Sequence, residues 1–68
     1  MRYAIMIEKT AMGFSAFVPD LPGCIATGAD RPEVESEIKN AIRFHADGLK
    51  EGGLPVPKPT SIAENVEA

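Results

Sequence analysis

The sequence predicts an α+β domain, with a three-stranded antiparallel meander, one amphipathic helix and a short extended or edge strand at the C-terminus. Three observations predict this fold: alternating apolar residues in two early segments, a Pro-Gly turn at residues 22–23, and apolar residues at helical spacing after residue 30. A chain of 68 residues has room for one domain only. We place its core at residues 2–51 and an extended arm at residues 54–68.

The first predicted strand covers residues 2–8. Tyr3, Ile5 and Ile7 alternate with the side chains of the other face, and we expect this Tyr3 face to be buried. A connection over residues 9–13 joins it to the second strand.

The second predicted strand covers residues 14–18 and carries an aromatic side chain on each face. Phe14 shares a face with Ala16 and Val18, and we expect that face to be buried. Phe17 lies on the opposite face, which indicates that a partner subunit or the tail covers this side of the sheet.

The turn between the second and third strands is the most specific feature of the chain. Pro22 sets φ at the first central position of a type II turn, and Gly23 supplies the positive φ that the second central position needs. The chain therefore reverses here, and the third strand, residues 24–28, pairs antiparallel with the second.

A helix starts after Asp30, which is a good N-cap, and Glu33 stands at N3, where its carboxylate can reach back to the cap. Gly52 and Gly53 end the helix. Between these ends, one apolar stripe is formed by residues spaced three and four apart: Val34, Ile38, Ala41, Ile42, His45 and Leu49.

The C-terminal segment has prolines at positions 55, 57 and 59, which impose an extended path and exclude a central strand. Residues 61–66 suit either one helical turn or a short terminal strand. Because each proline removes a hydrogen-bond donor, such an arm can pair with a sheet edge on a neighbouring chain without open-ended aggregation. We predict that Pro55, Val56 and Pro57 form an oligomerisation arm.

Composition excludes several classes of function. A net charge of −3 argues against direct binding of nucleic acid, and no apolar run is long enough to span a membrane. The N-terminus lacks a signal peptide, so we expect a cytoplasmic protein. One cysteine and one histidine provide neither a disulfide within the chain nor a metal or cofactor site. We therefore expect so small a core to be stabilised by homo-oligomerisation.

The chain offers few candidates for catalysis. His45 lies on the apolar stripe and fits a packed, hydrogen-bonded residue at the edge of the core better than a general base, and Cys24 fits a small buried hydrophobe. Asp20 precedes the turn, where carboxylates usually accept backbone N–H bonds. We therefore expect that the protein is not an enzyme. A hydrolase that uses His45 with Asp20 is the least favoured alternative.

Three segments, YAIMIEK, GFSAFVPDLPGCIATGADRPEVESEIKNAI and EGGLPVPKPTSIAE, together resemble the HicB-like antitoxins of bacterial HicA–HicB toxin–antitoxin pairs. The resemblance covers residues 2–64. It implies a β-β-β-α-β, partial RNase H-like fold and an antitoxin that binds a HicA-type toxin, a small basic ribonuclease that cleaves mRNA, and occludes its active site. It also implies a dimer or tetramer.

Many members of that family carry a further DNA-binding domain. This sequence stops at Ala68, about where such a domain would begin, so we expect no appended DNA-binding domain. For the partner-binding surface we predict the turn formed by Asp20, Leu21, Pro22 and Gly23, because a short rigid turn projects side chains at low entropic cost. The alternative function is a stand-alone oligomeric module without a cognate toxin.

Overall fold

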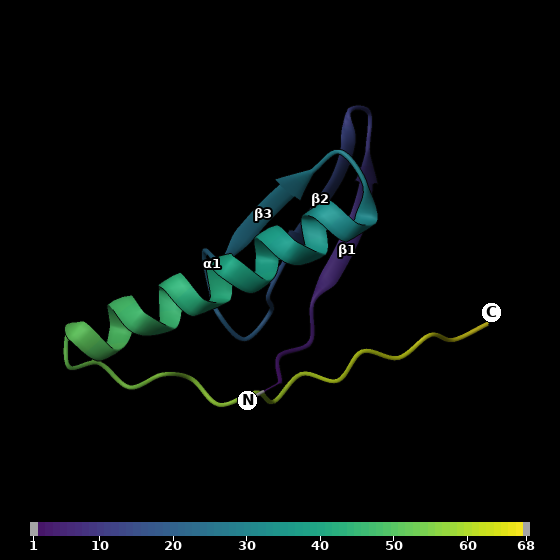
Figure 1. Cartoon of the computed structure of the whole chain (residues 1–68). Helices are drawn as coiled ribbons and strands as arrows, with labels where there is room; N and C mark the ends of the chain where they lie inside the picture. Colours follow the sequence, from purple (N-terminus) through teal and green to yellow (C-terminus); the bar gives the residue numbers. More distant parts are fainter. Residues whose placement is uncertain (1, 68) are drawn as a thin grey trace.

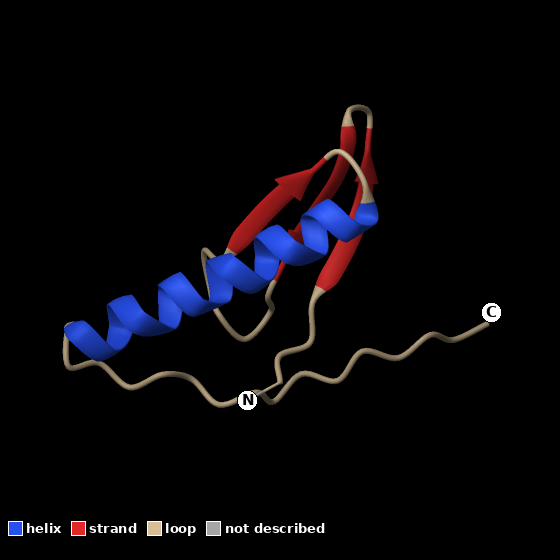
Figure 2. Ribbon diagram, in the orientation of Figure 1, coloured by secondary structure: helices blue, strands red, loops and turns tan. Residues whose placement is uncertain are grey.

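The computed structural model describes residues 2–67 and has two layers, a three-stranded sheet and one helix (Figure 1). The strands are β1 (Met6–Thr10), β2 (Gly13–Phe17) and β3 (Ile25–Gly28), and the helix is α1 (Arg31–Glu51). The sheet is antiparallel in the order β1-β2-β3, and α1 lies across one of its faces (Figure 2). The predicted α+β meander followed by a helix is confirmed.

The strand register gives the sheet two different faces. Ala16 pairs with Ala26 on the face that α1 covers. On the other face, Phe17 lies in one row with Met6 and Ile25 and is 39 % exposed, and Ile25 is 69 % exposed. Nothing within the described chain covers this row fully, so its cover by a partner subunit stays a prediction.

The first strand begins later and ends later than the sequence analysis predicts. Its pairing starts at Met6, opposite Phe17, because Pro19 follows soon afterwards and has no N–H with which to extend the ladder. It runs on to Thr10, so the connection to β2 shrinks to two residues. Tyr3 lies before the strand and still packs against the core, as expected.

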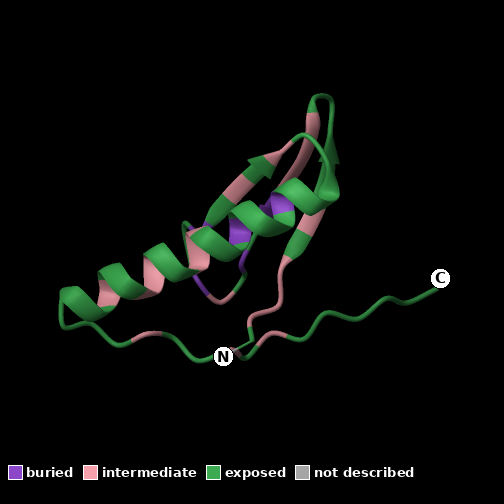
Figure 3. Cartoon of the chain, viewed as in Figure 1, coloured by how far each residue is buried: buried purple, intermediate pink, exposed green. Residues whose placement is uncertain are grey.

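The core lies between the sheet and the N-terminal half of α1, and it extends under the β2–β3 loop (Figure 3). Leu21 is completely buried although it lies in the loop and not in a strand. Val34 and Ile38, the first two members of the predicted stripe, face it from the helix. The buried core consists of Ala16, Val18, Leu21, Cys24, Val34 and Ile38.

The helix begins as predicted. Asp30 Oδ1 accepts a hydrogen bond from Glu33 N–H at 2.9 Å, and the Glu33 carboxylate accepts one from the N–H of Ala29, the residue before the cap. The structure also explains the glycine at position 28, which the sequence patterns do not predict. A Cβ on Gly28 would stand 2.6 Å from the backbone nitrogen of Val34, so only glycine lets the helix approach the sheet this closely.

The second half of α1 extends past the end of the sheet, and Phe44 is 84 % exposed there (Figure 1). The helix ends at the predicted glycines. Gly53 N–H donates to Lys50 O at 3.1 Å and Leu54 N–H donates to Leu49 O at 2.8 Å, which is the hydrogen-bond pattern of a Schellman motif.

The tail after the helix turns back beneath the body and runs extended, without helix or strand, to residue 67 (Figure 1). The expected C-terminal strand is therefore not confirmed. Its three prolines supply no N–H donors to a ladder. Ala68, the last residue of the predicted arm, lies outside the described residues. In the part of the chain that the structure describes, the one helix lacks the length of apolar sequence that a membrane crossing requires.

Candidate partner-binding surfaces

Two consecutive β-turns form the loop between β2 and β3. Leu21 N–H donates to Val18 O at 3.1 Å, and Cys24 N–H donates to Leu21 O at 3.0 Å. Gly23 has φ of +81°, which confirms the predicted Pro-Gly turn. The first turn was missed by the sequence analysis, although Pro19 in its second position is a signal for it.

The four residues predicted to bind a partner have different environments. Leu21 is fully buried in the core, and Asp20 is half-buried. Pro22 and Gly23 are exposed at the tip of the second turn. In this conformation, therefore, only Pro22 and Gly23 of these four residues are exposed to another molecule, and the role of the turn in binding stays a prediction.

Asp20 binds the tail of its own chain. Its Oδ2 accepts hydrogen bonds from the backbone N–H groups of Thr60 and Ser61, both at 2.9 Å. Its Oδ1 accepts hydrogen bonds from the two hydroxyls, at 2.9 Å from Thr60 and 2.8 Å from Ser61. Four donors thus surround a single carboxylate, and we call this arrangement the Asp20 latch.

These hydrogen bonds favour the charged form of the carboxylate. The N–H of Ser61, then the N–H of Thr60 and the Ser61 hydroxyl, lower the pKa of Asp20 from 3.8 to about 2. Such a carboxylate is a weak base with no lone pair left to orient a histidine. Asp20 therefore anchors the tail, and all four of its side-chain hydrogen bonds in the described chain go to Thr60 and Ser61.

The predicted arm is fixed to the body at a second point. Tyr3 OH donates a hydrogen bond to the carbonyl oxygen of Pro57. Within the arm, Val56 is half-buried, whereas Pro55 and Pro57 are exposed. The arm thus lies on its own chain between the end of α1 and the latch, and its predicted contact with a neighbouring chain is not tested.

Two further residues were considered for catalysis, Cys24 and His45. Cys24 is a free, buried thiol, and desolvation raises its pKa. His45 is half-buried on the overhanging part of α1, and its predicted hydrogen bond is not confirmed, since none of the side-chain hydrogen bonds of residues 2–67 involves it. Among residues 2–67, no three His, Cys, Asp or Glu side chains gather where they could hold a metal ion.

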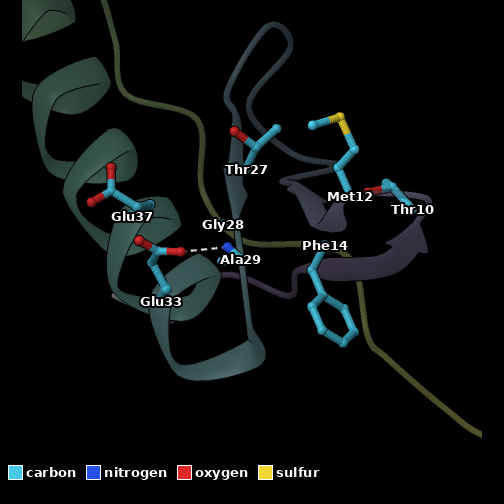
Figure 4. Close-up of a pocket in the computed structure, with 8 residues that line it drawn as sticks. All are labelled: Thr10, Met12, Phe14, Thr27, Gly28, Ala29, Glu33 and Glu37. Carbon is cyan, nitrogen blue, oxygen red and sulfur yellow. Dashed lines mark hydrogen bonds between the residues drawn. The ribbon is translucent and has the colours of Figure 1, made fainter.

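A hollow of about 610 Å³ lies at the end of the sheet, between the β1–β2 turn, β3 and the first turns of α1 (Figure 4). Phe14 and Met12 contribute apolar surface, and Glu33 and Glu37 contribute carboxylates from the helix. Glu33 was predicted only as part of the helix cap, and Glu37 was not predicted to line a site. Their spacing of four residues is the signal that places them side by side.

Comparisons with known proteins agree with this geometry. The family model described as "HicB_like antitoxin of bacterial toxin-antitoxin system" matches residues 3–68. A chain of the solved "HicA3 and HicB3 toxin-antitoxin complex" superposes with a TM-score of 0.76 at 32 % identity, covering 87 % of this chain and 70 % of that one.

Two curated relatives are similar in sequence. An uncharacterized 14.9 kDa protein of Haemophilus phage HP1 is 38 % identical over 66 residues, which is 97 % of this chain and 50 % of the phage protein. This chain therefore spans about half the length of that relative. The UPF0150 protein Ta0767 of Thermoplasma acidophilum is 33 % identical over 69 residues, the full length of both chains. The chain belongs to the HicB-like antitoxin family of bacterial toxin–antitoxin systems.

Proposed function

We propose that this protein is an antitoxin that binds a HicA-type toxin and covers its RNA-cleaving site, with no catalysis of its own. The observation that carries the proposal is the match, at 32 % identity over 87 % of the chain, to a chain of a solved toxin–antitoxin complex. The family model over residues 3–68 supports it independently. The net charge of −3 suits a basic partner, because opposite charge raises the rate of encounter.

The direct test uses a HicA-like toxin from the same genome, sought first beside this gene. We expect the two proteins to co-purify, and an equimolar amount of this chain to abolish cleavage of mRNA by the toxin. A complex that forms without loss of ribonuclease activity would contradict occlusion. Absence of any complex would contradict the antitoxin function itself.

The exposed tip of the β2–β3 loop is our proposed contact for the toxin. Pro22 and Gly23 stand on a turn that is held rigid by two backbone hydrogen bonds, so little conformational entropy is lost on binding. Pro22→Lys should raise the Kd for the toxin at least tenfold. Phe44→Lys adds the same charge at an exposed site on the overhanging helix and serves as the matched control.

We also infer that the arm, Pro55, Val56 and Pro57, mediates self-association. Few polar contacts fix it to its own chain, and the same contacts can be made to a second copy after the arm opens at the glycines that follow α1. Deleting residues 54–68 should lower the mass measured by light scattering to that of the monomer. Deleting only residues 63–68 keeps both anchors and should leave the mass of the assembly unchanged.

A stand-alone oligomeric module remains the second candidate function. The full-length match to the Thermoplasma acidophilum protein supports it, because that relative has no additional domain beside the matched region. A genome in which no small basic toxin gene adjoins this one would favour this function over the antitoxin.

A further inference from the structure

The two edges of the sheet are unequal. On the β1 side, tail residues 62–65 run beside the edge residues Ile5, Met6 and Ile7 and leave a hollow between them. On the β3 side no further strand pairs, since β3 ends the order β1-β2-β3, and the tail passes elsewhere (Figure 1). β3 is thus the edge of the described sheet that the chain's own tail leaves open.

The backbone groups that point outward from this edge follow from the ladder. Val18 N–H donates to Cys24 O at 3.1 Å, and the backbone groups of successive residues point alternately to either side of a strand. The backbone N–H and C=O groups of Ala26 therefore point to β2, whereas those of Ile25 and Thr27 point away from it. Both of the outward residues are exposed. They offer N–H and C=O groups to one further short strand.

The outward series ends at Ala29, whose N–H is already bound by the Glu33 carboxylate (Figure 4). Glu37 stands one helical turn further along, and both glutamates line the hollow together with Thr27. Among residues 2–67 the one salt bridge joins Arg31 to Glu35, so no ion pair within the described chain neutralises Glu37. The open edge thus lies beside negative charge.

We infer that the β3 edge docks an extended, basic segment of the toxin as an added strand, with a lysine or arginine of that segment beside Glu37. This inference rests on the proposed antitoxin function and names the surface that the function uses. Three features support it: unpaired backbone groups at Ile25 and Thr27, charge complementarity at the hollow, and continuity with the exposed turn at Pro22. Strand addition supplies affinity through main-chain hydrogen bonds and specificity through flanking side chains.

The occupant is a basic partner and not a second copy of this chain. Each copy carries a net charge of −3, and two β3 edges placed side by side would bring both sets of Glu33 and Glu37 together. Like charges brought together in this way are destabilising, whereas a basic strand gains from the same carboxylates.

The first test measures charge. Glu37→Lys should raise the Kd for the HicA-like toxin of the same genome, in a catalytically inactive form, at least tenfold. Glu51→Lys makes the same change of charge about 21 Å along α1 and should leave the Kd within about twofold. Glu33 is not substituted, because its carboxylate also caps the helix. Equal Kd values for both variants would overturn the inference.

The second test measures the edge directly by amide hydrogen exchange on the wild-type chain. Ile25 and Thr27 amides should exchange rapidly in the free protein and slow at least tenfold in the complex. The Ala26 amide, which points to β2, should be protected in both states and is the internal control. Unchanged exchange at Ile25 and Thr27 in the complex would overturn strand addition, and their protection in the free protein would assign the edge to a second copy instead.

The third test blocks the edge. Thr27→Pro removes an outward N–H that no strand of this sheet uses, so it should leave the fold intact and abolish most of the binding. Thr27→Val is the matched control, with near-normal Kd. If the wild-type chain binds the toxin and these variants bind equally well, the docking surface is wrong while the proposed function stands. If the wild-type chain does not bind, both are wrong.

Discussion

The body of this domain and its tail are held by different forces. In the body, Leu21, Val34 and Ile38 are excluded from water between the sheet and α1, and their burial supplies the stabilising free energy. The tail, residues 54–67, keeps Ile62 83 % exposed and is attached mainly by hydrogen bonds to Asp20 and Tyr3. Because burial stabilises the body, we expect it to unfold cooperatively. Because only a few polar contacts attach the tail, we expect it to detach while the body stays folded.

The largest effect is expected at the centre of the body. Leu21→Ala removes a fully buried side chain and leaves a cavity, which costs about 2–5 kcal/mol of unfolding free energy. For so small a domain this is about half of the total, since stability amounts to roughly 0.05–0.15 kcal/mol per residue. Thermal melting followed by circular dichroism measures it. Ile62→Ala truncates an exposed tail residue and should change the melting temperature little; an equal effect would erase the difference between body and tail.

The next largest effect concerns the contact between helix and sheet. Gly28→Ala places a Cβ 2.6 Å from the Val34 nitrogen, and the helix must shift, at a cost of about 1–3 kcal/mol. Gly48→Ala is the matched control, because nothing lies within 4 Å of its Cβ and alanine favours a helix interior. Urea unfolding of both variants should give opposite signs. A neutral Gly28→Ala would show that the helix is not tightly docked at this end.

Releasing the tail should leave the body folded. Asp20→Asn replaces an acceptor-only carboxylate by an amide with donors of its own, so the latch cannot bind four donors. The amides of Thr60 and Ser61 should exchange faster, and proteases should cut the tail sooner, while the exchange of the Val34 amide stays unchanged. Asp47→Asn on the exposed helix is the control. Slower folding or lower stability of the body would show that the latch belongs to the core.

The smallest effect is a pH dependence confined to the tail. Because the hydrogen bonds lower the pKa of Asp20 from 3.8 to about 2, its contribution is fully present above pH 3.8 and is lost as the pH falls through about 2. The amide shifts of Thr60 and Ser61, followed by NMR between pH 5 and the acid limit of the fold, should titrate near the lower value. A midpoint near 3.8 would mean that the latch is open in solution.

The sequence predicts most of the body because its determinants are local. Gly23 indicates the turn, Asp30 indicates the N-cap, and Val34 belongs to the apolar stripe of the helix. Each of these features can be identified from residues only a few positions away. The late start of β1 and the need for glycine at position 28 were not predictable in this way. The first depends on the pairing of β1 with β2, and the second depends on the close approach of α1 to the sheet.

The candidate surfaces were predicted less completely. Asp20 was identified at the turn, but its donors, Thr60 and Ser61, lie 40 and 41 positions away, and no periodicity marks a polar contact of that separation. Leu21 was included because a short rigid turn is expected to project its side chains outward, whereas two consecutive turns fold this side chain inward. The acidic hollow beside β3 was missed because it forms only when Glu37 is placed against a strand edge.

Because Cys24 is buried, the reactivity of its thiol reports on unfolding of the protein. The thiolate is the form that attacks thiol reagents, and the apolar surroundings of this sulfur both raise its pKa and shield it from reagent. Since the chain has a single cysteine, chemical labelling would follow one site without any engineered probe. The labelling rate would then measure how often the protein opens. A slower rate after addition of toxin would measure how much binding stabilises the folded state.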